Sequence, residues 1–263
     1  MIELPGFETQ GLTFEGAERT VFQSGAGEAV IVMPEIPGIT PAVAEFARRV
    51  VRAGYRVYVP QLFGVPMKPP TPGHSLKVLA RACIMREFRV LASDRSSPIV
   101  SWLRALARHA HAECGGKGVA AIGMCFTGNF ALAMMLDAPV LAAVLSQPSL
   151  PFGFSKHQRE ALHASPEEIQ AARNKTEQGA GILALRFIQD PLCPGERFAR
   201  LRTEFGSRCE TIEIDARHAN PDGPKPAHSV LTNHLIDAAG QPTREALDRT
   251  FAFLQEHLKA REP

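Results

Sequence analysis

Short apolar runs alternate along the chain with longer segments in which apolar residues recur at helical spacing. Runs of this length predict buried strands, and they lie at 29–33, 55–60, 118–122, 140–146, 182–188 and 210–214. The periodic segments predict helices at 41–53, 76–91, 97–112, 165–178, 195–205 and 243–259. One helix start is explicit, because Ser165-Pro166-Glu167-Glu168 is a capping box with proline at the first helical position. Strands and helices that alternate in this way predict an α/β fold, with a mostly parallel central sheet and helices on both faces.

Length and composition indicate a single α/β domain over residues 1–263. The hydrophobic content of 45% and charged content of 21% are ordinary for a globular protein in water. Basic and acidic residues are interleaved and the net charge is only +2, which excludes a basic surface for nucleic acid. No export signal is visible, and the longest apolar stretch, 130–145, is too short and too interrupted to cross a bilayer. We therefore expect a cytoplasmic protein, monomeric or homodimeric, without a nucleic-acid or membrane partner.

The cysteines do not form a paired framework. There are 5, at positions 83, 114, 125, 193 and 209, and an odd count without an export signal predicts free thiols in a reducing compartment. His109, His111 and Cys114 lie close together near a helix end, but residues two apart on a helix do not share a face. We expect a solvated helix end there, with no metal and no cofactor.

The segment Gly123-Met124-Cys125-Phe126-Thr127-Gly128 carries the strongest functional signal. It joins an apolar strand to a segment of small and apolar helical residues, and small residues flank a central cysteine. A small-x-nucleophile-x-small pattern at a strand-to-helix junction is typical of the nucleophile elbow of α/β-hydrolases. The turn is tight, so its flanking positions must be small, and Thr127 departs from the usual glycine. A buried structural cysteine is the alternative for an isolated Cys, but the strand–turn–helix context favours a nucleophile.

Three possible reactive groups follow predicted strands: Glu35 after 29–33, Cys125 after the elbow strand, and Asp190 after 182–188. Ligand chemistry in a parallel sheet belongs at the carboxyl ends of its strands. In α/β-hydrolases the triad runs nucleophile, acid, histidine along the chain, and Cys125 followed by Asp190 obeys that order. Two histidines then compete for the third role, His218 just after a strand and His228 ten residues later.

Four motifs together make the chain similar to the dienelactone hydrolase family over roughly residues 28–258. They are Glu35-Ile36-Pro37-Gly38, the elbow at 123–128, Asp190-Pro191-Leu192-Cys193-Pro194 and Ala227-His228-Ser229-Val230. The first two are the specific ones. The resemblance implies the α/β-hydrolase fold and a Cys-His-Asp triad of Cys125, His228 and Asp190, and its His-Ser pair favours His228 over His218. His163, His234 and His257 are expected to be solvated.

The resemblance also implies a mechanism. His228, oriented by Asp190, takes the thiol proton, and Glu35 near Cys125 helps to set the ionisation of the thiol. The backbone N–H groups of Ile36 and Phe126 form an oxyanion hole. In comparable sites each donor stabilises the transition state by roughly 3 kcal/mol. The reaction is transfer of an acyl group to Cys125 and hydrolysis of the thioester, so the partner is a small-molecule ester or lactone.

The substrate itself is not specified by these residues. Family members that act on dienelactone hold its carboxylate with arginines, one from a helix ahead of the elbow and one just after the histidine. Here Arg81, Arg86 and Arg89 lie out of clear register in the first region, and Thr232 stands four residues after His228. Two other functions stay open: a catalytically silent hydrolase fold that binds a ligand, and a redox-sensing thiol protein in which Cys125 is oxidised.

Overall fold

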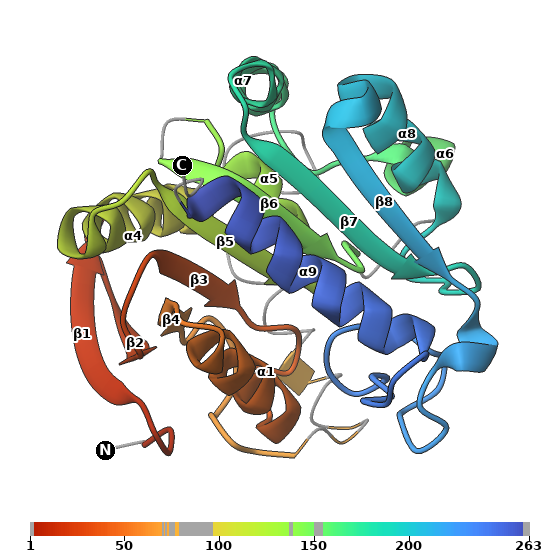
Figure 1. The fold of residues 1–263 in the computed structure, drawn as a ribbon, viewed down its shortest axis with the longest axis horizontal. Coiled ribbons are helices and arrows are strands. Elements are labelled where there is room, and N and C mark those ends of the chain that lie inside the picture. Colours follow the sequence, from red (N-terminus) through yellow and green to blue (C-terminus); the bar gives the residue numbers. More distant parts are fainter. Residues whose placement is uncertain are drawn as a thin grey trace.

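A single eight-stranded sheet organises the computed structural model, which describes residues 3–69, 71, 73, 77, 78, 97–136, 139–149 and 155–259 (Figure 1). The strands are β1 (Glu8–Phe14), β2 (Ala17–Ser24), β3 (Ala29–Met33), β4 (Arg56–Pro60), β5 (Val119–Met124), β6 (Val140–Ser146), β7 (Gly181–Phe187) and β8 (Cys209–Ile214). Their order is β1-β2-β4-β3-β5-β6-β7-β8. Pairing is parallel from β4 through β8, and antiparallel between β1 and β2 and between β2 and β4.

Helices cover both faces of this sheet. Their bounds are α1 (Pro41–Arg52), α4 (Pro98–Cys114), α5 (Gly128–Ala133), α6 (Lys156–Glu160), α7 (Pro166–Glu177), α8 (Gly195–Phe205) and α9 (Pro242–Leu258), with 3-10 turns at Cys125–Thr127, Gly206–Arg208 and Ala216–His218. Successive strand residues point to opposite faces, so Val30 and Val32 belong to the apolar cluster that includes residues of α1 and α9, while Ile31 belongs to the cluster that includes residues of α4, α5, α7 and α8. The mostly parallel sheet with helices on both faces is confirmed.

The predicted strands and most predicted helices are present, with ends that differ by a few residues. Fully buried runs such as β3 and β7 are recognisable because both faces are covered. The hairpin of β1 and β2 was not predicted, because most β1 side chains are exposed and no apolar run marks the strand. The short helix α6 was also missed, and most of the helix predicted at 76–91 falls outside the described residues.

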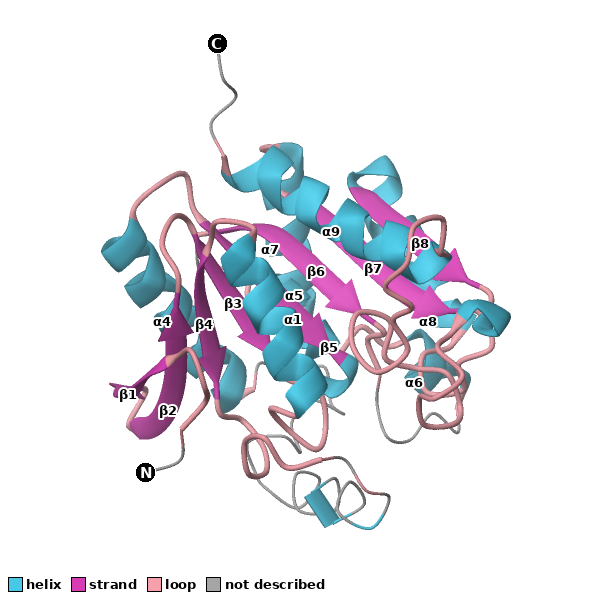
Figure 2. Cartoon of the chain, turned by 60° about the horizontal axis from the view of Figure 1, so that its bottom comes forward, coloured by secondary structure: helices cyan, strands magenta, loops and turns pink. Residues whose placement is uncertain are grey.

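The parallel strands bring the candidate residues to one edge. β3 pairs with β5 up to Met33 opposite Gly123, and β5 pairs with β6 up to Met124 opposite Ser146. The loops that follow these strands therefore begin side by side, at the edge where the arrowheads of β3, β5, β6 and β7 lie (Figure 2). This edge carries Glu35, Cys125 and Asp190.

Candidate active site

The elbow has the strained geometry that its sequence predicts. Cys125 directly follows β5 and has φ of 55°, in the left-handed region that a residue with a side chain seldom adopts. Backbone strain of this kind is retained where a side chain must be presented in a fixed direction. α5 begins three residues later and is buried along its whole length. Cys125 is thus raised out of a rigid strand–turn–helix unit.

Two glycines make this turn possible. A Cβ atom on Gly123 would lie 2.1 Å from the carbonyl oxygen of Thr127, and one on Gly128 would lie 2.7 Å from Cα of Pro148. Thr127 is fully buried. Its hydroxyl accepts a hydrogen bond from the Met124 amide at 2.9 Å and donates to a backbone carbonyl, that of Met33 lying at 3.1 Å. Threonine therefore fits at the position where the family pattern has glycine, because the tight contacts fall at 123 and 128.

Asp190 and His228 form a direct pair. Nδ1 of His228 lies 2.6 Å from Oδ2 of Asp190, and the other carboxylate oxygen accepts from the Leu192 amide at 2.9 Å. The carboxylate is 3% exposed, so little water competes for it. Since an ionised carboxylate can only accept, Nδ1 carries a proton and Nε2 is the atom left to exchange one.

The free nitrogen of His228 is associated with Cys125. Among the described residues, Nε2 of His228 is buried and has no hydrogen-bond partner of ordinary geometry. Burial opposes the imidazolium, but the neighbouring Cys125 sulfur and Asp190 outweigh it and hold the pKa of His228 well above its ordinary value. A buried acceptor beside a thiol is the arrangement needed to remove the thiol proton.

Glu35 is enclosed by neutral donors. Its side chain is 2% exposed and accepts hydrogen bonds from Gln147 (3.2 Å), Ser229 (2.7 Å), Thr232 (2.7 Å) and Asn233 (3.3 Å). Three of these donors belong to the segment that follows His228, so Glu35 ties the end of β3 to the histidine loop. None of its hydrogen bonds goes to Cys125, and its direct approach to the thiol remains a prediction.

The histidine loop contains a residue whose role the sequence did not reveal. His234, expected to be solvated, is fully buried: its Nδ1 accepts from the amides of His228 (3.3 Å) and Ser229 (3.0 Å), and its Nε2 donates to Pro224 O (2.6 Å). Burial lowers the pKa of His234 below its ordinary value, which keeps Nδ1 free to accept. His163 is also buried rather than solvated.

His218 occupies a different place. It lies in the 3-10 turn just after β8, and its Nε2 accepts a hydrogen bond from the exposed Arg217 side chain at 3.2 Å. No hydrogen bond of the described structure joins His218 to Asp190 or Cys125. Of the two candidates, His228 is the one paired with the acid.

The sequence profile of the dienelactone hydrolase family matches residues 19–258. The chain belongs to the dienelactone hydrolase family. It is therefore a hydrolase that acts on ester bonds. No curated protein matches the chain at a significant level.

Solved structures share the fold at low identity. A Klebsiella pneumoniae protein assigned to the dienelactone hydrolases has a TM-score of 0.63 and 17% identity, over 95% of this chain and 98% of that one. A dienelactone hydrolase-like promiscuous phosphotriesterase from metagenomic libraries has a TM-score of 0.62 and 18% identity, over 95% and 98%. A cold-adapted esterase from an Arctic intertidal metagenomic library has a TM-score of 0.61 and 14% identity, over 96% and 94%. At these identities the likeness concerns the fold.

Thr232 is a local departure from the family pattern. Its hydroxyl donates to Oε1 of Glu35 at 2.7 Å, so the residue at the position where the resemblance implies an arginine for the substrate carboxylate is bonded to Glu35 instead. The side chain is buried. Arg81, Arg86 and Arg89, the other candidates for binding a substrate carboxylate, lie outside the described residues.

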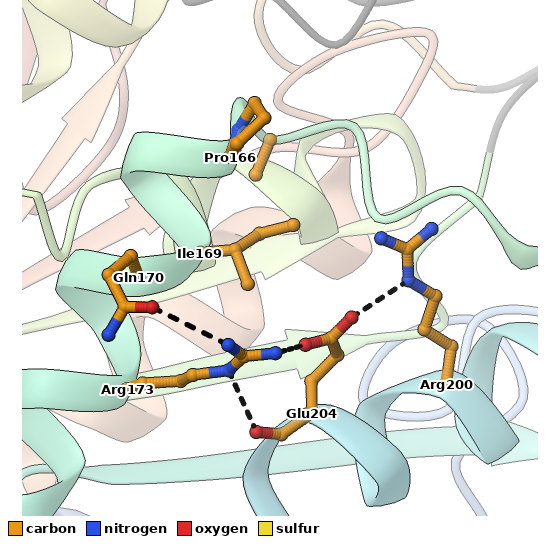
Figure 3. A pocket seen from close by; sticks show the side chains of 7 residues that line it. Pro166, Ile169, Gln170, Arg173, Arg200 and Glu204 are labelled. Atoms are coloured by element: carbon orange, nitrogen blue, oxygen red, sulfur yellow. Dashed lines mark hydrogen bonds and ion pairs between the residues drawn. The ribbon is translucent and has the colours of Figure 1, made fainter.

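A cavity of about 270 Å³ lies between α7 and α8 (Figure 3). It is lined by Ala164, Pro166, Ile169, Gln170, Arg173, Arg200 and Glu204. Arg173 and Arg200 both hydrogen-bond the Glu204 carboxylate, which neutralises part of their charge. None of the candidate catalytic residues lines this cavity.

Within the described residues, no cluster of His, Cys, Asp and Glu could hold a metal ion, and no helix is long and apolar enough to cross a membrane.

The raised pKa of His228 gives a testable dependence of stability on pH. Because the folded pKa lies above 6.5, the protonated imidazole contributes stability that is fully present below about pH 6.5 and is lost as pH rises through the folded pKa. We expect the difference in unfolding free energy between the native chain and His228→Gln to be larger at about pH 6 than at about pH 9 in urea titrations. NMR titration of the imidazole should show a midpoint above 6.5, and a midpoint below 6.5 would contradict the assignment.

Proposed function

We propose that the chain hydrolyses a small ester or lactone through a Cys-His-Asp triad and an acyl-thioester intermediate. The observation that carries the proposal is the buried imidazole of His228, whose Nδ1 lies 2.6 Å from Asp190 and whose Nε2, beside the sulfur of Cys125, has no other hydrogen-bond partner among the described residues. A free cysteine side chain is only a few per cent thiolate near pH 7, so a nucleophilic cysteine needs such a base to remove its proton.

The acylation step uses the thiolate directly. His228 takes the proton from Cys125, and the sulfur attacks the carbonyl carbon of the ester. The C–O bond to the alcohol then breaks, and the imidazolium returns its proton to the departing alkoxide oxygen. Backbone N–H groups of Ile36 and Phe126, which follow β3 and β5, are proposed to bind the oxyanion of the tetrahedral intermediate.

Deacylation repeats these roles with water. His228 removes one proton from the water as its oxygen attacks the thioester carbon, and the C–S bond breaks with its electron pair on sulfur. The carboxylic acid leaves, and a thiolate beside an imidazolium remains. Glu35 is proposed to influence this ionisation through its neighbours, since its hydrogen bonds reach Ser229 beside His228 and Gln147 at the end of β6.

Trapping the acyl-enzyme tests the proposal. The reaction with p-nitrophenyl acetate is quenched in acid during turnover, and the peptides are analysed by mass spectrometry. We expect one acetyl group on the peptide that contains Cys125. Burial raises the pKa of Cys209 to about 12 and also raises that of Cys114 and Cys193, so these thiols are poor competitors near neutral pH. An acetyl group found only on another residue, or turnover without any acyl-enzyme under all quench times, would count against the thioester route.

A further inference from the structure

Ser149 contacts the proposed nucleophile directly. Its hydroxyl donates a hydrogen bond to Sγ of Cys125 at 3.3 Å, and its backbone N–H donates to the Cys125 carbonyl at 3.0 Å. The residue is 2% exposed, so water does not replace the hydroxyl easily. Two bonds to one residue fix Ser149 relative to the elbow.

The segment before Ser149 is held from two sides. The carbonyl of Pro148 accepts from Nη1 of the buried Arg197 at 2.6 Å, and that guanidinium also donates to Ala161 O at 2.8 Å. Gln147 has φ of 37° and is fully buried. Its side-chain Nε2 donates to the Glu35 carboxylate at 3.2 Å, and its Oε1 accepts from the backbone N–H of Val230 at 3.2 Å. A strained residue held by this many contacts indicates that the position of the following hydroxyl is specified rather than incidental.

A hydroxyl donor in this position favours charge on sulfur. A hydrogen bond to an ionised acceptor is shorter and stronger than one to its neutral form, so the same O–H stabilises the thiolate more than the thiol. Charge is present on sulfur twice in the proposed cycle, before attack and again when the C–S bond of the thioester breaks. In the second event the electron pair passes to the sulfur that Ser149 contacts.

We propose that Ser149 is a further catalytic residue, whose hydroxyl stabilises the Cys125 thiolate both as nucleophile and as leaving group. The proposal rests on the proposed function for its catalytic consequence, but its effect on the thiol is independent of turnover. Ser149 lies just beyond β6, outside the triad and outside the two oxyanion donors.

The test compares side chains of equal shape. Ser149→Thr keeps the hydroxyl and adds a methyl group, Ser149→Val has the shape of that threonine with a methyl group in place of the hydroxyl, and Ser149→Ala removes the hydroxyl without adding bulk. Alkylation of Cys125 by iodoacetamide is followed by peptide mapping between about pH 5 and pH 9. We expect the valine and alanine variants to react about tenfold more slowly than wild type near pH 6, with the midpoint of the profile raised by about one pH unit. The threonine variant should stay close to wild type.

Ser165→Ala is the control for general destabilisation, because Ser165 caps α7 and bonds Glu168 rather than Cys125. It should lower the unfolding free energy and leave the alkylation profile unchanged.

Superimposable profiles for the threonine and valine variants would overturn the role of the hydroxyl. If Cys125→Ala kept its esterase activity while Ser149→Val still shifted the profile, the proposed function would fail and the contact would stand. In stopped-flow experiments with p-nitrophenyl acetate, both the burst of p-nitrophenol and the steady-state rate should be slower for Ser149→Val than for Ser149→Thr, because the thiolate is less stabilised before attack and when it leaves.

Discussion

Cys125→Ala is expected to abolish ester hydrolysis, with a loss of about four orders of magnitude in kcat as for other members of a catalytic triad. The variant removes one sulfur atom and leaves the buried α5 and its packing in place, so we expect a cooperative unfolding transition close to that of wild type. The measurement is p-nitrophenyl acetate hydrolysis together with thermal unfolding of the same preparation.

Two variants serve as controls for this result. Cys209→Ala removes a buried thiol at the start of β8, and Glu204→Gln alters the cavity between α7 and α8; both should retain hydrolysis. If Cys125→Ala kept most of the activity, the nucleophile would have to lie elsewhere. Ser146 and Ser229 are poor replacements, because their hydroxyls are buried and donate to Gln147 and Glu35.

His228→Ala is expected to lower kcat by several powers of ten, and His218→Ala to leave it largely unchanged. The first change removes the base and leaves the buried Asp190 carboxylate without its partner at 2.6 Å. The second removes a side chain whose hydrogen bond goes to the exposed Arg217. Initial rates over a pH series give both kcat and the pH profile. A large loss in His218→Ala with normal activity in His228→Ala would place the base at residue 218.

His234→Gln distinguishes loss of the base from loss of its support. The His234 imidazole accepts hydrogen bonds from the amides of His228 and Ser229. The substitution therefore disturbs the loop that carries His228 but leaves the His228 imidazole itself in place. An intermediate loss in this variant, smaller than that of His228→Ala, is consistent with His228 as the base.

The sequence predicts the sheet and the tight turn at Cys125 because both depend on local pattern. Buried strands such as β5 are continuous apolar runs, and the elbow combines a strand end with small residues on both sides of Cys125. The hairpin of β1 and β2 escapes the same reasoning because β1 is a mostly exposed edge strand and the buried run of β2 is only three residues long, Val21-Phe22-Gln23. The turn between the two strands, Glu15-Gly16 with both φ positive, is the local signal that could have revealed it.

The supporting residues of the site were not predictable in the same way. Glu35 is separated from Ser229 by 194 positions and from Thr232 by 197, and no periodic pattern connects them. His234 looked solvated because nothing in its immediate sequence requires burial. Its ring packs against Gly223, where a Cβ atom would meet the ring at 2.6 Å, and the sequence does not show that contact. Such contacts depend on tertiary packing.

The left-handed backbone at Cys125 limits which side chains this position can accept. Serine shares the unbranched Cβ of cysteine and tolerates a φ of 55° about as well, so an exchange of sulfur for oxygen leaves the elbow intact. Threonine brings a branched Cβ that crowds the same backbone and costs roughly 1–3 kcal/mol in such conformations. One substitution can therefore exchange the thiol for a primary hydroxyl without disturbing the backbone, whereas a secondary alcohol at this position requires a rebuilt turn.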